Sequence, residues 1–168
     1  MQSPEATKPK LHAGYMEVAI AQLLGYRRNV IVPNVSWGLG LNHECDMLVL
    51  SPGKKLTEIE IKVTFSDFKR DFDKRHGHTS KYISRLVYAL PSELIDRAMP
   101  MIPRECGVIS VEHYGHSFAP FRAQWVRQAR HSKLLQPVPD SVINKLYELG
   151  CMRIWDLKLA YYNAKSKK

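Results

Sequence analysis

Two apolar stretches joined by a short turn are the feature that most constrains the fold of this chain. They cover residues 43–50 and 56–63, and β-branched and other apolar side chains typical of strands dominate both. The connecting residues are Ser51-Pro52-Gly53-Lys54, which are typical turn formers. The sequence therefore predicts an antiparallel pair of strands here, and the rest of the chain must complete and cover a sheet.

The second stretch alternates between apolar and ionisable side chains. Because successive strand residues point to opposite faces, the alternation separates them into two sets. One face carries Ile59, Ile61 and Val63, and the other carries Glu58, Glu60 and Lys62. The hairpin would also bring Asp46 close to Glu60. Two carboxylates and a lysine on one sheet can hold a hard divalent cation beside a general base or charge stabiliser.

The composition indicates one basic globular domain. The chain has 168 residues, of which 45% are apolar, so it can bury a substantial core. Lys and Arg number 25 against 16 Asp and Glu, and the formal net charge of +9 favours a polyanionic partner such as nucleic acid, although many small basic proteins bind none. We expect a flexible arm over residues 1–10, a single domain over 11–163 and a basic tail over 164–168.

Cysteine usage and hydropathy favour a cytoplasmic protein. Cys45, Cys106 and Cys151 are odd in number and widely spaced, which is typical of a reducing compartment. No apolar run approaches the roughly 20 residues that a membrane-spanning helix needs, and residues 1–10 contain no apolar signal core.

Periodicity and capping residues predict the order of the elements. Helices are expected over residues 13–24, over a short segment after residue 63, and over 93–99 and 141–149. Strands are expected over 29–36, 43–50, 56–63, 85–90, 106–111 and 121–126. Pro33 indicates an edge strand or a strand end. Gly25 is expected to cap the first helix and Gly150 to close the last, although residues 152–162 could continue as a helix.

The charged residues and the element order together resemble a known nuclease core. Asp46, thirteen intervening residues, and then Glu60-x-Lys62 resemble the motif of the PD-(D/E)XK superfamily, and a helix, a strand and a hairpin form the entry to its core. The wider run, including ECDMLVL and LTEIEIKVTFSDFKRD, is similar to the MmcB-like group of DNA repair proteins and to related phage-borne proteins. The resemblance covers Leu11–Val111 and, more faintly, Trp125–Leu149. Cys45 stands where the superfamily motif has a proline.

The resemblance implies a fold, a cofactor and a set of roles. The fold would be α/β, with a restriction-endonuclease-like αβββαβ core in which helices flank a mixed central sheet. Asp46 and Glu60 would hold Mg²⁺ or Mn²⁺ together with the backbone carbonyl of Ile61. Lys62 would orient or deprotonate the attacking water. Glu17, on the first helix, would be an accessory carboxylate, although the edge of that helix's buried face is the commoner place for such a residue.

A basic surface is expected to contact the phosphates of nucleic acid. Its members are Arg27, Arg28, Lys69, Arg70, Lys74, Arg75, Lys81 and Arg85. Lys81 and Tyr82 also match, more loosely, polar positions that follow the core in several nuclease branches. Glu44 and Glu58 are expected to lie beside the metal site or to face solvent. Trp125 and Trp155 are interpreted as packing residues.

Competing chemistries are less well supported. His43, Cys45, Cys106, His113 and His116 include soft metal ligands, but they lack the close paired spacing of a structural zinc site. Cys45 and Cys106 lie in apolar strands and indicate core residues rather than nucleophiles. A hydrolase acting on a small molecule is disfavoured by the basic surface and by the lack of a nucleophile motif.

The sequence therefore favours a metal-dependent deoxyribonuclease that acts in DNA repair or in the processing of phage or mobile-element DNA. Substrate choice would be directed by DNA structure, since no base-reading module is evident. The alternative is a DNA-binding protein with a nuclease fold that does not cleave. Whether the chain acts as a homodimer or with a helicase or repair partner stays open. The choices between DNA and RNA, between single and double strands, and between endonuclease and exonuclease stay open too, as does catalytic activity itself.

Overall fold

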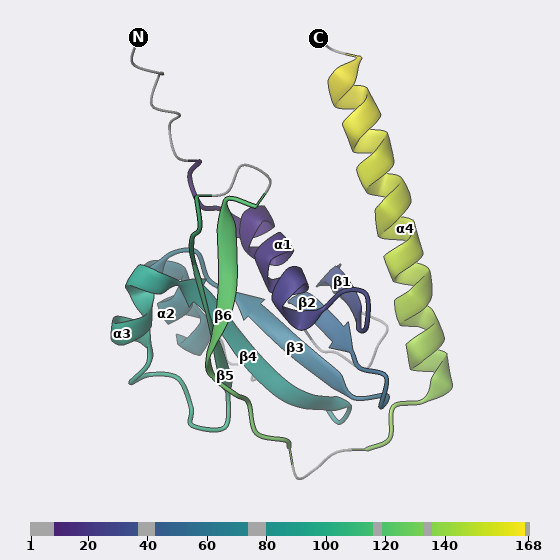
Figure 1. Cartoon of the computed structure of the whole chain (residues 1–168). Coiled ribbons are helices and arrows are strands. Elements are labelled where there is room, and N and C mark those ends of the chain that lie inside the picture. The colour runs from purple at the N-terminus through teal and green to yellow at the C-terminus, as the bar shows by residue number, and fades with distance from the viewer. Residues whose placement is uncertain (1–8, 37–42, 74–79, 116–118, 133–135, 167–168) are drawn as a thin grey trace, which may run out of the picture.

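The computed structural model describes residues 9–36, 43–73, 80–115, 119–132 and 136–166. Its elements in chain order are α1 (Ala13–Leu24), β1 (Val30–Val35), β2 (Cys45–Leu50), β3 (Leu56–Ile61), α2 (Phe65–Asp73), β4 (Ile83–Pro91), η1 (Ser92–Leu94), α3 (Ile95–Ala98), β5 (Gly107–His113), β6 (Phe121–Arg127) and α4 (Asp140–Lys165). From α1 to β4 this is the expected αβββαβ order, and the α/β class is confirmed (Figure 1).

One mixed sheet of six strands forms the centre of the fold. Its strands lie in sequence order from β1 to β6. β1, β2 and β3 pair antiparallel, β3, β4 and β5 pair parallel, and β6 returns antiparallel to β5. The parallel pairs need crossovers, which α2 and the η1–α3 segment supply. β1 is an edge strand, as Pro33 predicts, because proline lacks the amide that a second neighbour would require.

Helix α1 covers one face of the sheet. Met16 and Ile20 are fully buried, and they pack on the apolar side chains that β3 and β5 present to this face, among them Ile59 and Ile109. Gly25 ends the helix as predicted, with a φ of 71° that only glycine adopts without cost, and its amide closes the last turn on Ala21 and Gln22. Because α1 covers the face of β3 that carries Ile59 and Ile61, the ionisable residues of β3 lie on the other face.

Two smaller clusters cover the opposite face. Phe68 of α2 and Ala98 of α3 pack over Tyr88 and Leu90 of β4. The first turns of α4 pack Ile143 and Leu146 over β1 and β2. β4 therefore contacts apolar groups on both faces, which explains its nearly continuous apolar sequence and confirms its predicted central position.

Helix α4 differs from the prediction because it continues through Gly150 to Lys165. At Gly150 the helix passes close to β1: a Cβ there would lie 3.4 Å from Val32 Cγ2. Glycine thus permits close helix–strand packing instead of ending the helix. Arg153 still donates to the carbonyl of Asn34 on β1 at 2.9 Å, and beyond it α4 extends away from the sheet (Figure 1). The prediction of Trp155 as a packing residue is wrong, since 66% of it is exposed.

Among the described helices, α4 included, none combines the length and the apolar character needed to cross a membrane.

The two halves of α4 should respond differently to the same substitution. Leu146→Ala should lower the free energy of unfolding by about 2–5 kcal/mol, because Leu146 is 1% exposed and its removal leaves a cavity over β1. Leu157→Ala, at a residue 67% exposed, should change it by less than about 0.5 kcal/mol. Urea denaturation of the two variants and the wild type measures both values. Equal losses would mean that the outer half of α4 is packed in solution.

Candidate active site

The ionisable residues of β3, and Lys62 directly after it, are buried, and the two glutamates lie on the face opposite α1. The exposed fractions are 0% for Glu58, 3% for Glu60 and 5% for Lys62. Their apolar neighbours Ile59 and Ile61 point to the other face and pack beneath α1. The predicted alternation of β3 is therefore confirmed. The expectation that Glu58 lies beside the site or faces solvent is met only in its first part, because Glu58 is fully enclosed.

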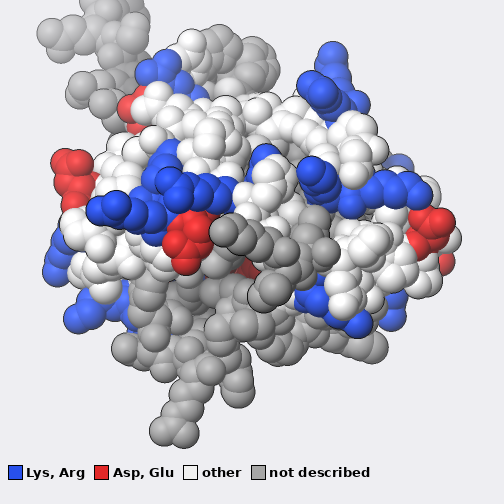
Figure 2. Space-filling model, turned by 90° about the horizontal axis from the view of Figure 1, so that it is seen from below, with Lys and Arg blue, Asp and Glu red and all other residues white. Residues whose placement is uncertain are grey.

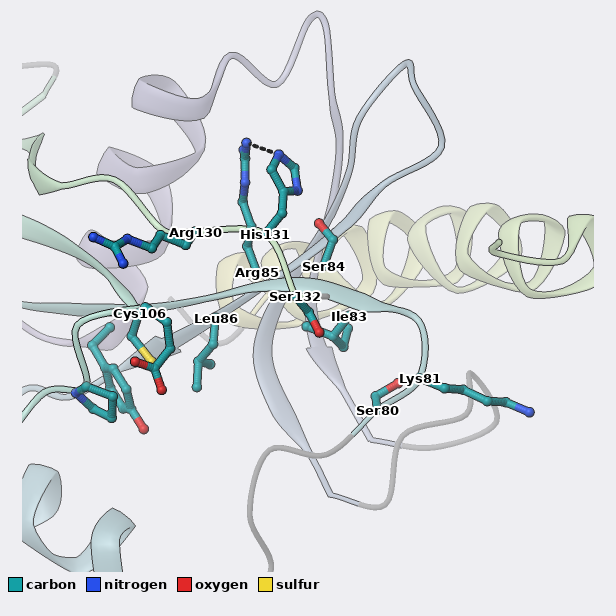
Figure 3. Close-up of a pocket in the computed structure, with 13 residues that line it drawn as sticks. Ser80, Lys81, Ile83, Ser84, Arg85, Leu86, Cys106, Arg130, His131 and Ser132 are labelled. Atoms are coloured by element: carbon teal, nitrogen blue, oxygen red, sulfur yellow. Dashed lines mark hydrogen bonds between the residues drawn. The ribbon is translucent and has the colours of Figure 1, made fainter. Parts of the chain in front are cut away.

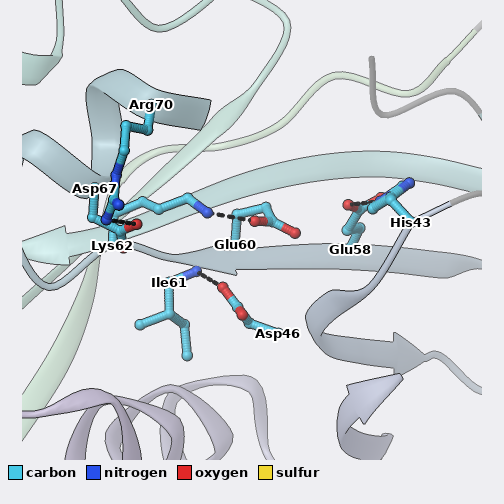
Figure 4. Close-up of polar contacts among 8 residues, drawn as sticks. All are labelled: His43, Asp46, Glu58, Glu60, Ile61, Lys62, Asp67 and Arg70. Carbon is cyan, nitrogen blue, oxygen red and sulfur yellow. Dashed lines mark hydrogen bonds and ion pairs between the residues drawn. The ribbon is translucent and has the colours of Figure 1, made fainter. Parts of the chain in front are cut away.

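Asp46 joins β2 to β3 at the point where their ladder ends. The last paired residues are Met47 and Ile59, and one step further the Oδ2 of Asp46 accepts a hydrogen bond of 2.6 Å from the amide of Ile61 (Figure 4). A carboxylate held by a backbone amide has little freedom to turn away. The amide of Lys62 then donates to the carbonyl of Ala89 on β4. Of the predicted trio, Glu60 and Lys62 contact each other, whereas Asp46 is held by the Ile61 amide and acts on Glu60 through its charge.

Glu60 and Lys62 form a buried ion pair. Lys62 Nζ donates to Glu60 Oε2 at 2.7 Å. The other carboxylate oxygen, Glu60 Oε1, is buried and has no hydrogen-bond partner among the described residues. Burial is the largest cause that raises the pKa of Glu60 to about 7; Lys62 opposes it, and the carboxylates of Asp46 and Glu58 add to it. This carboxyl therefore needs more positive charge than Lys62 provides.

A second ion pair lies further back along β3. His43, which directly precedes β2, places Nε2 2.6 Å from Glu58 Oε1. The ligand atoms of His43, Glu58 and Glu60 all lie within 4.8 Å of one another. Sequence reasoning named Glu58 only as a neighbour of the site and left His43 among weak zinc ligands. The available signal was the Glu58-x-Glu60 alternation, which places both carboxylates on one face.

Glu17 is half-buried on α1, on the side of the sheet that this helix covers. Burial raises the pKa of its carboxyl, and the negative charge of Asp46 raises it further. The two carboxylates are therefore within electrostatic range of each other. Glu17 is not part of the group of three that contains Glu60.

The residues present fit a divalent cation. Asp46 and Glu60 supply hard oxygen atoms, and the orphaned Glu60 Oε1 is a buried acceptor that a cation would satisfy. Ile61, whose carbonyl is the expected third ligand, donates its backbone amide to Asp46. An oxygen-rich set of this kind suits Mg²⁺ or Mn²⁺.

The predicted nucleic-acid-binding residues come from separate elements. Arg27 and Arg28 are exposed in the turn after α1, Lys69 and Arg70 are exposed on α2, and Lys81 is exposed just before β4. Tyr82 is half-buried and packs beside the α4 cluster, with Lys81 Nζ 5.1 Å from its ring centre. Lys74 and Arg75 lie outside the described residues. Figure 2 shows that Lys and Arg predominate over Asp and Glu on the underside of the molecule.

A hollow of about 650 Å³ opens beside β4, the strand next to β3. It is lined in part by Leu86 and Tyr88 of β4, which pair with Glu58 and Glu60 on β3 and share their face of the sheet. Its walls also include Lys81, Arg85, Arg130 and His131. The hollow therefore lies one strand away from the buried carboxylates and is bordered by basic residues (Figure 3).

Arg85 and His131 contact each other at this border. Arg85 Nη2 lies 2.6 Å from His131 Nε2, and the positive charge of Arg85 is the main cause that lowers the pKa of His131, with a further contribution from Lys55. Figure 3 shows the two side chains pointing together to one side of β4. The positive charge of Arg85 favours an anion such as a phosphate at this border, while the lowered pKa favours a neutral His131 that accepts from Arg85.

Cys45 and Cys106 are core residues, as predicted. Cys45 Sγ donates to the carbonyl of Val35 at 3.5 Å, and burial together with the carboxylates of Glu58 and Glu60 raises its thiol pKa. Burial is also the main cause that raises the pKa of Cys106 to about 11. Because the thiolate is the nucleophile, these thiols are poor candidates for covalent catalysis.

Comparison with known proteins identifies the family. The model for the family described as DNA repair protein MmcB-like matches residues 7–160. The chain belongs to the MmcB-like DNA repair protein family. Among solved structures, it is similar to the SPO1766 protein of unknown function from Silicibacter pomeroyi, with a TM-score of 0.63 and 20% identity over 94% of this chain and 96% of that chain. At this identity the likeness shows the fold alone. No curated protein gives a significant match.

Titration of Glu60 offers a direct test of this site in the presence of a chelator. Its folded pKa of about 7 lies above the ordinary value of 4.5, so the folded state holds the proton more tightly than the unfolded state. The stability that this group contributes should therefore be fully present below pH about 4.5 and lost as the pH rises through about 7.

We expect a Glu60 carboxyl ¹³C resonance with its midpoint near pH 7, and a higher midpoint in Lys62→Met, which removes the group that lowers the pKa. The resonance is assigned by its loss in Glu60→Gln. A midpoint near 4.5 in the wild type would mean that the carboxyl is solvated.

Proposed function

We propose that this member of the MmcB-like DNA repair family is a metal-dependent nuclease of the PD-(D/E)XK type that hydrolyses DNA phosphodiester bonds. The observation that carries the proposal is the buried Glu60–Lys62 pair next to Asp46, at the point where β2 and β3 separate. Burying ionisable groups costs free energy. Carboxylates with pKa values perturbed by burial concentrate at functional sites.

Each residue has a role that follows from its position. Asp46, fixed by the Ile61 amide, and Glu60, with its orphaned oxygen, would hold Mg²⁺ or Mn²⁺ together with the Ile61 carbonyl. When bound, the cation neutralises charge on the phosphate and lowers the pKa of a water. Lys62 Nζ, 2.7 Å from Glu60, would orient or deprotonate the attacking water. The water oxygen bonds to phosphorus while the P–O ester bond breaks. Glu17 would act as an accessory carboxylate through Asp46.

The DNA backbone would be held by basic residues of several elements. Arg27, Arg28, Lys69, Arg70 and Lys81 are exposed, and Tyr82 lies beside Lys81. Lys74 and Arg75, which lie outside the described residues, are included on the sequence alone. Arg85 lines the neighbouring hollow and adds a positive charge on the side of β4 opposite Leu86 (Figure 3). The net charge of +9 supports this binding, since neutralising phosphates releases counterions. Action in DNA repair or in phage and mobile-element DNA processing, as a homodimer or with a helicase partner, fits this proposal.

Cleavage of labelled single-stranded, duplex and branched DNA with Mg²⁺ or Mn²⁺ tests the function. Asp46→Asn and Lys62→Met should each lower the rate by at least about 100-fold, because one removes a cation ligand and the other the group next to the attacking water. Glu112→Gln is the matched control, a half-buried acid on β5, two strands away from β3, and it should cut like the wild type.

The competing function is a nuclease-fold protein that binds DNA without cleaving it. It would be supported by DNA binding with no cutting under any divalent metal. Cutting that survives both Asp46→Asn and Lys62→Met would place the chemistry elsewhere and remove the proposed site.

A further inference from the structure

Three side chains of the buried face form a group that the proposed nuclease site does not use as a unit. His43 Nε2, a carboxylate oxygen of Glu58 and a carboxylate oxygen of Glu60 all lie within 4.8 Å of one another. They come from the residues just before β2 and from alternate positions of β3. Asp46 is not a member. In Figure 4 His43 and Glu58 lie on the side of Glu60 away from Lys62.

An independent observation indicates a ligand at this position. Glu60 is 97% buried, and its Oε1 is buried with no hydrogen-bond partner among the described residues, while its Oε2 accepts from Lys62. Figure 4 shows one Glu60 oxygen directed at Lys62 and the other directed along β3 toward Glu58 and His43. An unsatisfied buried carboxylate oxygen costs free energy, and a cation beside it removes that cost.

The chemistry of the group selects among cations. An imidazole nitrogen with two carboxylates is a ligand set for first-row transition metals such as Mn²⁺ or Zn²⁺, whereas Mg²⁺ prefers oxygen and retains its waters. We propose that His43, Glu58 and Glu60 form a second cation site, which binds a divalent transition-metal ion and shares Glu60 with the site at Asp46. The proposal deepens the proposed nuclease function and rests on it in one respect, the assignment of Glu60 to both sites.

The group must contract to accept the ion, because its ligand atoms lie within 4.8 Å of one another, while its closest pair already has a suitable spacing. Two atoms bound to one such metal lie about 3 Å apart at metal–ligand distances near 2.1 Å. His43 Nε2 and Glu58 Oε1 are 2.6 Å apart, joined by a hydrogen bond in which the imidazole donates. The ion takes the place of the shared proton, which leaves to solvent. The side chain of His43 is 15% exposed and thus gives the buried group a contact with solvent.

A shared Glu60 would couple the two sites. Bridging carboxylates place two cations close enough to act on the same phosphate, on the attacking side and the leaving side. An enzyme so arranged would work better with Mn²⁺ than with Mg²⁺, because only Mn²⁺ would fill the His43 site. The single histidine in the group is therefore the residue that would set metal preference.

Metal binding to the DNA-free protein tests the proposal independently of activity. The probe is Mn²⁺, monitored by the loss of the free-ion electron paramagnetic resonance signal, with Mg²⁺ added in excess as competitor. The wild type should retain one Mn²⁺ that Mg²⁺ does not displace. His43→Gln should weaken that ion at least about 10-fold, whereas Asp46→Asn should retain it. His113→Gln, an exposed histidine on β5, is the matched control.

Pulsed electron paramagnetic resonance on the wild type gives a second measurement, which does not depend on how the variants fold. The retained Mn²⁺ should show a ¹⁴N coupling from an imidazole. Retained binding in His43→Gln, complete displacement by Mg²⁺ in the wild type, or the lack of nitrogen coupling would each overturn the proposal. A nitrogen-coupled Mn²⁺ in a protein that cuts no DNA would reject the nuclease and leave this site standing.

Discussion

The structure depends on the burial of three ionisable side chains at alternate positions in and just after β3. Glu58, Glu60 and Lys62 are each at most 5% exposed, on a strand that also anchors the apolar core. An isolated buried charge costs several kcal/mol, so each of them must find a partner close by. Lys62 pairs with Glu60, and His43 pairs with Glu58. The His43–Glu58 contact also fixes the segment that precedes β2 relative to β3.

The opposite face of the sheet makes this arrangement possible. Ile59 and Ile61 are locked beneath α1, so β3 can neither rotate nor slip by one residue without exposing them and placing carboxylates in the core. Close packing at the β5–β6 side of the sheet also helps to hold the strands in place. A Cβ at Gly107 would lie 3.0 Å from the backbone nitrogen of Ala129, so only glycine lets the chain after β6 pass this close to β5. The rigid apolar core on the α1 side of the sheet thus fixes the positions of the buried ionisable side chains on the other side.

Local sequence patterns predicted the sheet because strand alternation and hairpin pairing depend on residues that are close in sequence. Alternation along residues 56–63 gave the correct face for each side chain, and Pro33 gave the edge strand. Asp46 and Glu60 could be paired because a hairpin fixes which residues face each other. The failures involve contacts distant in sequence. Gly150 ends no helix, because its close approach to Val32 is a tertiary contact. The pairing of His43 with Glu58 and the basic border at Arg85 and His131 likewise depend on packing that periodicity does not encode.

The different settings of the three cysteines have a practical consequence for chemical labelling. Cys45 and Cys106 are at most 5% exposed, and their raised thiol pKa values keep both protonated at neutral pH. Cys151 is exposed on α4, next to Gly150, where the helix passes close to β1. An alkylating dye therefore has one accessible thiol, which lies on the outward half of α4 and away from the buried carboxylates. Fluorescence from that position would report on the surroundings of the extended helix in a chain whose catalytic candidates remain unmodified.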